Sequence, residues 1–190
     1  MTSPDPFADL RIPRDYGRNP RRPKFREAAA LIEVEPNLVG TMQRLAPETA
    51  AAWREMKRSA AAAQVQLLLV SGFRSIGHQA EIIRRKLAAG QSIDAILAVN
   101  AAPGFSEHHT GRAVDIATPG TRPLTAEFDG SAAFQWLQAN AEEFGFRMPY
   151  GHGNRFGFEY EPWHWSQVET QERKRKDARA RGDRSIFARK

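Results

Sequence analysis

The stretch SEHHTGRAVD, residues 106–115, is the part of the chain from which both fold and chemistry can be inferred. It leaves a Gly- and Pro-bearing loop and enters an alternating run typical of a strand, with Ala113 and Asp115 on one face. His108 stands in the loop, seven residues before that aspartate. Because Gly111 and Ala113 are small, a ligand can approach the backbone here. We therefore interpret the stretch as one half of a metal site.

The other half lies in EYEPWHW, residues 159–165, where Glu161 and His164 are three apart and Pro162 holds the preceding residue extended. Two imidazoles and one carboxylate form a common catalytic zinc set that leaves the fourth position to water. A carboxylate beside the metal can then take the proton of that water. The residues that meet these requirements are His108, Asp115 and His164 as metal ligands and Glu161 as general base.

Each half also has an ordinary explanation. A histidine and an aspartate seven residues apart occur often by chance, and the string EPWH can be an aromatic turn packed on the core. The spacing differs from the helical His-Glu-x-x-His pattern, so a zinc peptidase with these residues has another architecture.

Hydrophobic periodicity along the chain predicts helices that alternate with short strands. The expected helices cover residues 47–64, 76–89 with Ser75 as cap, a short stretch after Ser92, and 131–144. The expected strands are the apolar run at residues 66–73, the alternating run at 112–118, and the region at 160–168.

The 190-residue chain has a formal charge of +6, which invites a nucleic-acid interpretation. Residues 172–190 hold nine Lys/Arg and three Asp/Glu, whereas the rest of the chain holds 19 of each sign. A second basic cluster lies within residues 11–26. We expect a basic Pro/Arg-rich arm at 1–26, one catalytic domain at 27–170 and a basic tail at 171–190. These basic ends make a nucleic-acid or anionic-polymer binding module the alternative from another class. The few aromatic residues among the charges argue against it.

The chain has no cysteine, which excludes disulfides, thiol catalysis and cysteine zinc sites. No apolar run approaches the roughly 20 residues of a membrane span. The first 20 residues lack the basic start and apolar stretch of a signal peptide. We expect a cytoplasmic chain as written, or a periplasmic or cell-wall protein if a leader was removed or another export route is used.

Three ordered motifs resemble those of the zinc D-alanyl-D-alanine carboxypeptidases of VanY type. Residues 106–115 resemble the Ser-x-His-x-x-Gly-x-Ala-x-Asp signature of this family, and the string Glu161-Pro-Trp-His164 resembles its Glu-x-x-His motif. The string SGFRS at 71–75, followed by Gln79, resembles the family's Ser-Gly-Tyr-Arg-Ser segment, with Phe73 in place of tyrosine. The resemblance spans roughly residues 45–168 and implies an α+β domain with a small central antiparallel sheet flanked by helices, like hedgehog and D,D-peptidase domains.

The resemblance also implies the roles of individual residues. It makes His108, Asp115 and His164 the zinc ligands, Glu161 the general base, and Arg74 the residue that faces the scissile carbonyl oxygen. It places Gln79 and Ser106 near the terminal carboxylate of the substrate. Trp163 is a candidate wall of the pocket, although aromatic residues near a site more often pack in a core. His109 is a histidine that the motif register passes over in favour of its neighbour.

The activity that the resemblance implies is removal of the last D-alanine from a peptidoglycan peptide or muropeptide, with D-Ala-D-Ala as the leading substrate. An L,D-carboxypeptidase, which cuts D-alanine from a tetrapeptide, and an endopeptidase of the same fold remain alternatives. A metal-binding relative without catalysis is a third, which the presence of both Glu161 and Arg74 disfavours.

Overall fold

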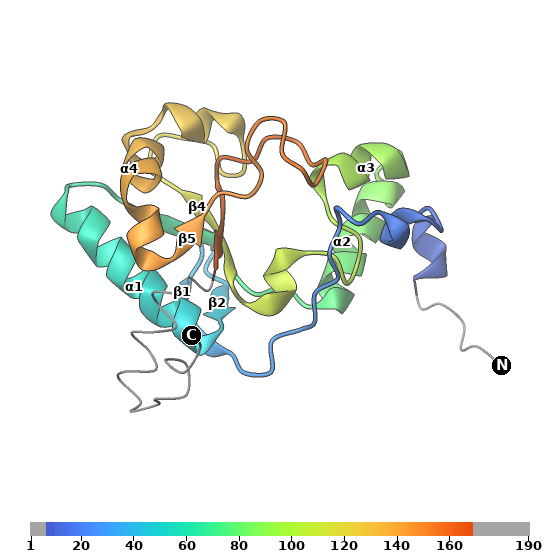
Figure 1. Cartoon of the computed structure of the whole chain (residues 1–190), viewed down its shortest axis with the longest axis horizontal. Helices are drawn as coiled ribbons and strands as arrows, with labels where there is room; N and C mark the ends of the chain where they lie inside the picture. The colour runs from blue at the N-terminus through green and yellow to red at the C-terminus, as the bar shows by residue number, and fades with distance from the viewer. Residues whose placement is uncertain (1–6, 169–190) are drawn as a thin grey trace, which may run out of the picture.

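The computed structural model describes residues 7–168, which form four α-helices and two small antiparallel sheets (Figure 1). Short 3-10 helices at Ala8–Leu10, Tyr16–Arg18, Glu107–Thr110, Ala126–Gly130 and Ala141–Phe144 join them. The principal elements, in chain order, are β1 (Ile32–Pro36), β2 (Met42–Leu45), α1 (Pro47–Ala62), β3 (Leu68–Ser71), α2 (Ile76–Ala88), α3 (Ile93–Val99), β4 (Ala113–Ala117), α4 (Ala132–Asn140), β5 (Phe146–Arg147) and β6 (His164–Gln167).

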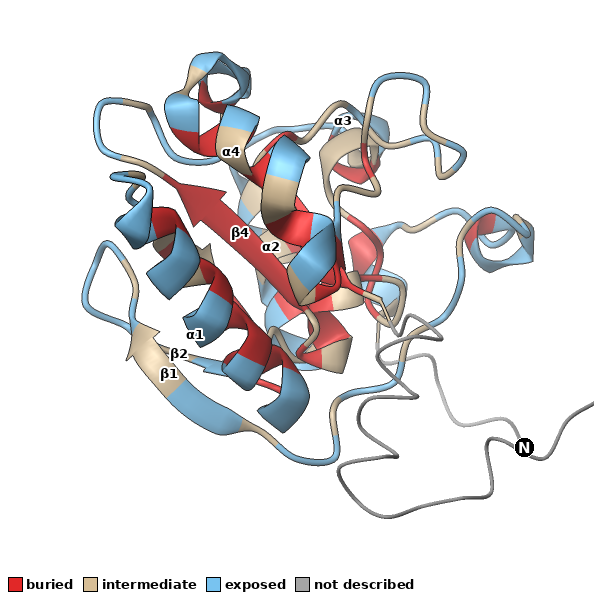
Figure 2. Ribbon diagram, turned by 60° about the vertical axis from the view of Figure 1, so that its left-hand side comes forward, coloured by how far each residue is buried: buried red, intermediate tan, exposed pale blue. Residues whose placement is uncertain are grey.

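The four-stranded sheet, in the order β3-β4-β6-β5, forms the centre of the molecule. All five residues of β4 are buried, because its two neighbouring strands and the surrounding elements cover it (Figure 2). Ser71 pairs with Asp115 across β3 and β4, and Asp115 pairs with His164 across β4 and β6. One row across three strands therefore brings together residues that are far apart in the sequence.

Helices α1 and α4 lie together on one side of the molecule, and α2 and α3 lie on the other (Figure 1). Helix α1 starts with Pro47 in its first turn, where a missing N–H costs little. Its buried face includes Trp53 and Met56, and this face packs with the sheet and α4 in the largest hydrophobic core (Figure 2). The expectation of an α+β domain with a small antiparallel sheet flanked by helices is confirmed.

Serine side chains cap three of the helices, as local sequence predicts for α2. The side-chain oxygen of Ser75 accepts a hydrogen bond from the backbone N–H of His78. At the start of α3, the side-chain oxygen of Ser92 accepts one from the N–H of Ala95. Each cap satisfies a backbone donor that the first helical turn leaves unpaired. The caps fix where α2 and α3 begin, beside the loops that carry the site.

Residues 7–26, within the segment expected to be an extended arm, pack against α2 and α3. Leu10 is fully buried in a small core with Ile83, and Tyr16 is buried in a second one with Leu97. The hydroxyl of Tyr16 accepts a hydrogen bond from the backbone N–H of Ala102 at 3.2 Å. Leu10 and Tyr16, with the partly buried Phe7 and Ile12, thus pack this basic, proline-rich segment onto the body.

The predicted basic tail at 171–190 lies outside the described residues. Within residues 7–168, no helix has the length and hydropathy needed to cross a membrane.

Candidate active site

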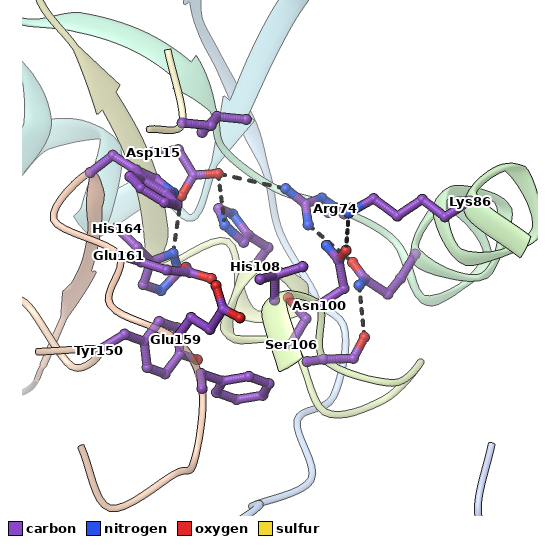
Figure 3. A pocket seen from close by; sticks show the side chains of 16 residues that line it. Arg74, Lys86, Asn100, Ser106, His108, Asp115, Tyr150, Glu159, Glu161 and His164 are labelled. Atoms are coloured by element: carbon purple, nitrogen blue, oxygen red, sulfur yellow. Dashed lines mark hydrogen bonds and ion pairs between the residues drawn. The ribbon is translucent and has the colours of Figure 1, made fainter. Parts of the chain in front are cut away.

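Two histidines and one aspartate meet beside β4 (Figure 3). His108 lies in the short helix Glu107–Thr110, Asp115 in β4 and His164 at the start of β6. One nitrogen or oxygen atom from each residue lies within 4.8 Å of those of the other two, and all three side chains are buried. The β4–β6 register places Asp115 opposite His164, and the turn at Gly111 brings His108 to them.

Gly111 has a left-handed backbone at φ +66°, and a Cβ there would meet the backbone N of Ala46 at 2.8 Å. Glycine alone accepts both constraints at no cost. Gly111 therefore allows the close backbone contact with Ala46 and the turn that leads the chain into β4.

Each imidazole has one ring nitrogen bound to an acceptor outside the three-residue cluster and the other facing Asp115. His108 Nδ1 donates to the carbonyl of Gly72 at 2.6 Å, which leaves its Nε2 facing Asp115 Oδ2 at 3.2 Å. His164 Nδ1 lies 3.0 Å from Asp115 Oδ1, and its Nε2 lies 2.9 Å from Glu107 Oε2. Protein metal sites orient their imidazoles in this way, with the second ring nitrogen held by a carbonyl or a carboxylate. The donor set thus fits a zinc ion.

The charges of the cluster also favour a cation. Burial raises the pKa of Asp115, but the neighbouring imidazoles of His108 and His164 outweigh it and hold that pKa far below its usual range. Burial lowers the pKa of His108, which keeps this ring neutral. Burial likewise opposes a charge on His164, yet its hydrogen bonds to Asp115 and Glu107 raise its pKa to about 10. Two carboxylates around one ring thus stabilise a positive charge at this point.

Glu107 is a residue of the site that the sequence did not single out. Its carboxylate accepts a hydrogen bond from Ser166 Oγ and is hydrogen-bonded to His164 Nε2. It is absent from the lining of the cleft, so its contact with the site runs through His164. The available signal was its position directly before His108 in the motif, which gave no reason to prefer it over other acidic residues.

We predict that Glu107→Gln weakens metal binding by about 10–100-fold, the usual cost of losing a carboxylate behind a ligating histidine. The amide keeps the size of the side chain but cannot stabilise charge on His164. Competition with a chromophoric chelator measures the affinity. Glu143→Gln, an exposed glutamate on the short helix Ala141–Phe144, is the matched control and should bind metal like the wild type. Equal affinities for all three proteins would contradict the positioning role.

Glu161 lines the same cleft, in the turn that leads into β6. Its backbone carbonyl accepts a hydrogen bond from His164 N–H at 3.1 Å, and its own N–H donates to the carbonyl of Tyr150 at 3.0 Å. Burial raises the pKa of Glu161 to about 7, although the adjacent His164 lowers it. A carboxylate with this pKa can both accept and release a proton near neutrality.

Arg74 is held rigidly next to the cluster. Its guanidinium donates to Ser71 Oγ and to Gln79 Oε1, each at 3.1 Å, and lies 3.6 Å from Asp115 Oδ2. Gln79 is fully buried and donates to the carbonyl of Ala101 at 2.7 Å. The structure thus gives Gln79 a contact with Arg74, and its predicted contact with a substrate carboxylate stays a prediction.

The cleft in front of the cluster has a volume of about 360 Å³. Ser106 and Trp163, both predicted to contact substrate, line it, and the hydroxyl of Ser106 has no hydrogen-bond partner among residues 7–168. Tyr150 stacks on His164 with 4.6 Å between ring centroids. Tyr150 thus packs on one face of the His164 ring, while Asp115 and Glu107 hold its two nitrogens.

His109 has a structural role. Its Nδ1 donates to the carbonyl of Arg74 at 2.6 Å, and its Nε2 accepts from the N–H of Gly104 at 3.1 Å. The ring is fully buried and ties the loop after β3 to the loop before His108. Of the two adjacent histidines, the one that the motif register selects, His108, is the one that joins the cluster, and its role as a metal ligand stays a prediction.

A buried His–Asp–His cluster that shares a cleft with a carboxyl group and a fixed arginine is an arrangement suited to peptide hydrolysis. The chain belongs to the VanY family, described as D-alanyl-D-alanine carboxypeptidase, whose pattern matches residues 42–170. The sequence resemblance is thereby confirmed.

Two curated proteins are similar to this chain over its central part. YodJ of Bacillus subtilis (strain 168) is 36% identical over 124 residues, which cover 64% of this chain and 45% of YodJ. The D-alanyl-D-alanine carboxypeptidase of Enterococcus faecalis (strain ATCC 700802 / V583) is 32% identical over 111 residues, or 53% of this chain and 40% of that enzyme. The chain thus spans less than half the length of both relatives.

Solved structures of several peptidases have the same fold as this chain. The LD-carboxypeptidase LdcB is 30% identical with a TM-score of 0.68, covering 83% of this chain and 77% of LdcB. A zinc complex of the vancomycin resistance D,D-pentapeptidase VanY is 27% identical with a TM-score of 0.58, over 76% and 83% of the two chains. VanYB in complex with D-Alanine-D-Alanine is 26% identical, also with a TM-score of 0.58, over 86% and 92%.

Proposed function

We propose that this protein is a zinc-dependent carboxypeptidase that removes the C-terminal D-alanine from peptidoglycan stem peptides. The observation that carries the proposal is the single cleft in which the buried cluster of His108, Asp115 and His164 adjoins Glu161 and Arg74. The partner we propose is accordingly a peptidoglycan peptide or muropeptide.

His108, Asp115 and His164 would hold the zinc ion, as their converging donor atoms and buried surroundings support. When bound there, zinc supplies Lewis acidity to the scissile carbonyl and lowers the pKa of water. The similar VanY structure is a zinc complex, which favours this metal over other divalent ions.

The side chains of the protein supply the remaining chemistry. Glu161, with its pKa raised by burial, takes a proton from the attacking water and passes it to the departing amine. Arg74 presents a fixed guanidinium to the carbonyl oxygen, where negative charge develops as the peptide bond is attacked. Because Ser71 and Gln79 already hold Arg74, little reorganisation is needed during the reaction.

D-Ala-D-Ala is the leading substrate, supported by the family match and by the similarity to VanYB bound to D-Alanine-D-Alanine. The second candidate is an L,D-carboxypeptidase, supported by the higher TM-score with LdcB. The two activities differ in the residue before the scissile bond, which is D-alanine in a pentapeptide and a diamino acid in a tetrapeptide.

Mass spectrometry of defined stem peptides tests the proposal. We expect the zinc-loaded protein to release one D-alanine from a pentapeptide and to lose this activity in the presence of a chelator. Release of D-alanine from the tetrapeptide alone would establish the second candidate. If neither peptide loses D-alanine, or if cleavage persists after complete metal removal, the proposed function is wrong.

A further inference from the structure

Lys86 lies on the inward face of α2, in its last turn. It follows Gln79 and Ile83 at helical spacing, and both of those side chains are fully buried. Lys86 is partly buried, and its ammonium donates a hydrogen bond to Asn100 Oδ1 at the end of α3. A lysine on the inward face of a helix has its charge partly removed from water.

The ammonium of Lys86 faces the catalytic cleft. Lys86 and Asn100 both belong to the cleft lining, and Figure 3 shows Lys86 entering from α2 with Arg74 between it and Asp115. Among the described residues that line the cleft, Arg74 and Lys86 are the only lysines and arginines. The guanidinium of Arg74 already contacts three side chains of the site, whereas Lys86 has a neutral amide as its partner.

The surroundings of Lys86 give its ammonium no carboxylate in direct contact among the described residues. Burial lowers the pKa of this lysine, the nearby charge of Arg74 lowers it further, and Glu161 opposes both effects. Lys86 makes no ion pair with any carboxylate of residues 7–168. A partly desolvated ammonium without a carboxylate in direct contact is suited to pair with an incoming anionic group.

We propose that Lys86, held in place by Asn100, binds the terminal carboxylate of the substrate and thereby selects peptides with a free C-terminus. This inference rests on the proposed function, because a carboxypeptidase substrate carries a carboxylate one residue beyond the scissile carbonyl. Arg74, next to the metal-binding cluster, is placed to face that carbonyl. Lys86 is the next cation along the cleft, on the far side of Arg74 from Asp115. An endopeptidase would meet no free carboxylate at this position.

Lys86 also has a possible structural role, because a cation in the last turn complements the helix dipole and the bond to Asn100 ties α2 to α3. If that role were the only one, removing Lys86 would lower stability and would change kcat/KM by the same factor for every substrate. A role in recognition predicts instead that the loss depends on whether the peptide ends in a carboxylate.

The test compares one stem peptide with a free C-terminal carboxylate and the same peptide with a C-terminal amide. We expect Lys86→Gln to lower kcat/KM for the acid by about 10–100-fold, since a hydrogen bond to a charged group is lost, and to leave kcat/KM for the amide unchanged. Lys86→Arg should retain most of the discrimination. Arg85→Gln, the exposed neighbour on α2, removes the same charge outside the cleft and should behave like the wild type.

A binding measurement keeps the inference testable if no peptide is cleaved. Calorimetric titration of the zinc-loaded Glu161→Gln variant with the acid and amide peptides should show tighter binding of the acid, and adding Lys86→Gln should remove that preference. Absence of cleavage with a preserved preference would contradict the proposed function alone. Equal binding of acid and amide by the Glu161→Gln protein, or an equal effect of Lys86→Gln on both peptides, would overturn the role of Lys86.

Discussion

Replacing Glu161 with glutamine is expected to lower kcat by about 10²–10⁴-fold, the range for a lost general base, while the protein still binds its metal. The amide has nearly the same shape as the carboxylate but cannot accept the proton of the attacking water. The side chain lines the cleft without belonging to the buried cluster of His108, Asp115 and His164. The expected result is therefore a folded, metal-loaded and almost inactive protein. Turnover of a pentapeptide stem and metal content after dialysis measure the two quantities.

Glu159 provides the matched comparison for this substitution. It also lines the cleft, two residues earlier in the same loop, but its side chain is exposed whereas Glu161 is partly buried. We expect Glu159→Gln to lower turnover far less than Glu161→Gln does. If Glu159→Gln lowered turnover more than Glu161→Gln, Glu159 and not Glu161 would be the general base. Loss of metal from the Glu161→Gln protein would show that Glu161 belongs to the metal-binding set.

The candidate site residues could be singled out because short motifs placed them in or beside predicted strands. The alternating run at 112–118 predicted a strand with Asp115 on one face, and the Glu-x-x-His string placed His164 at the start of another. The structure pairs these two residues directly across β4 and β6. The partnership itself could not be predicted, because strand register depends on contacts between segments about 50 residues apart.

The supporting residues escaped prediction for the same physical reason. Lys86 is held by Asn100, which directly follows α3, and Glu107 contacts His164, which is on a distant strand. Composition also concealed the packing of residues 7–26, because Leu10 and Tyr16 stand among prolines and arginines. The average composition of the segment does not show these few apolar side chains, which pack it against the body.

The second large effect is expected at Asp115. Its carboxylate lies 3.0 Å from His164 Nδ1 and 3.2 Å from His108 Nε2, so it is the charged centre of the cluster. Asp115→Asn keeps the size and one oxygen but removes the negative charge that holds a cation. We expect metal affinity to fall by more than the roughly 10–100-fold cost of losing a supporting partner, and peptide cleavage to fall to background. Metal content after dialysis and cleavage of the pentapeptide check both outcomes.

Asp94→Asn is the matched control, since Asp94 is exposed on α3 and does not line the catalytic cleft. It should retain metal and activity, while circular dichroism shows whether the Asp115→Asn protein is folded. Chelation of the wild-type protein tests the same dependence without relying on that variant, and returning zinc should restore cleavage. A folded Asp115→Asn protein that keeps stoichiometric metal and full activity would contradict the ligand assignment, because no neutral amide can replace the only carboxylate of this cluster at equal affinity.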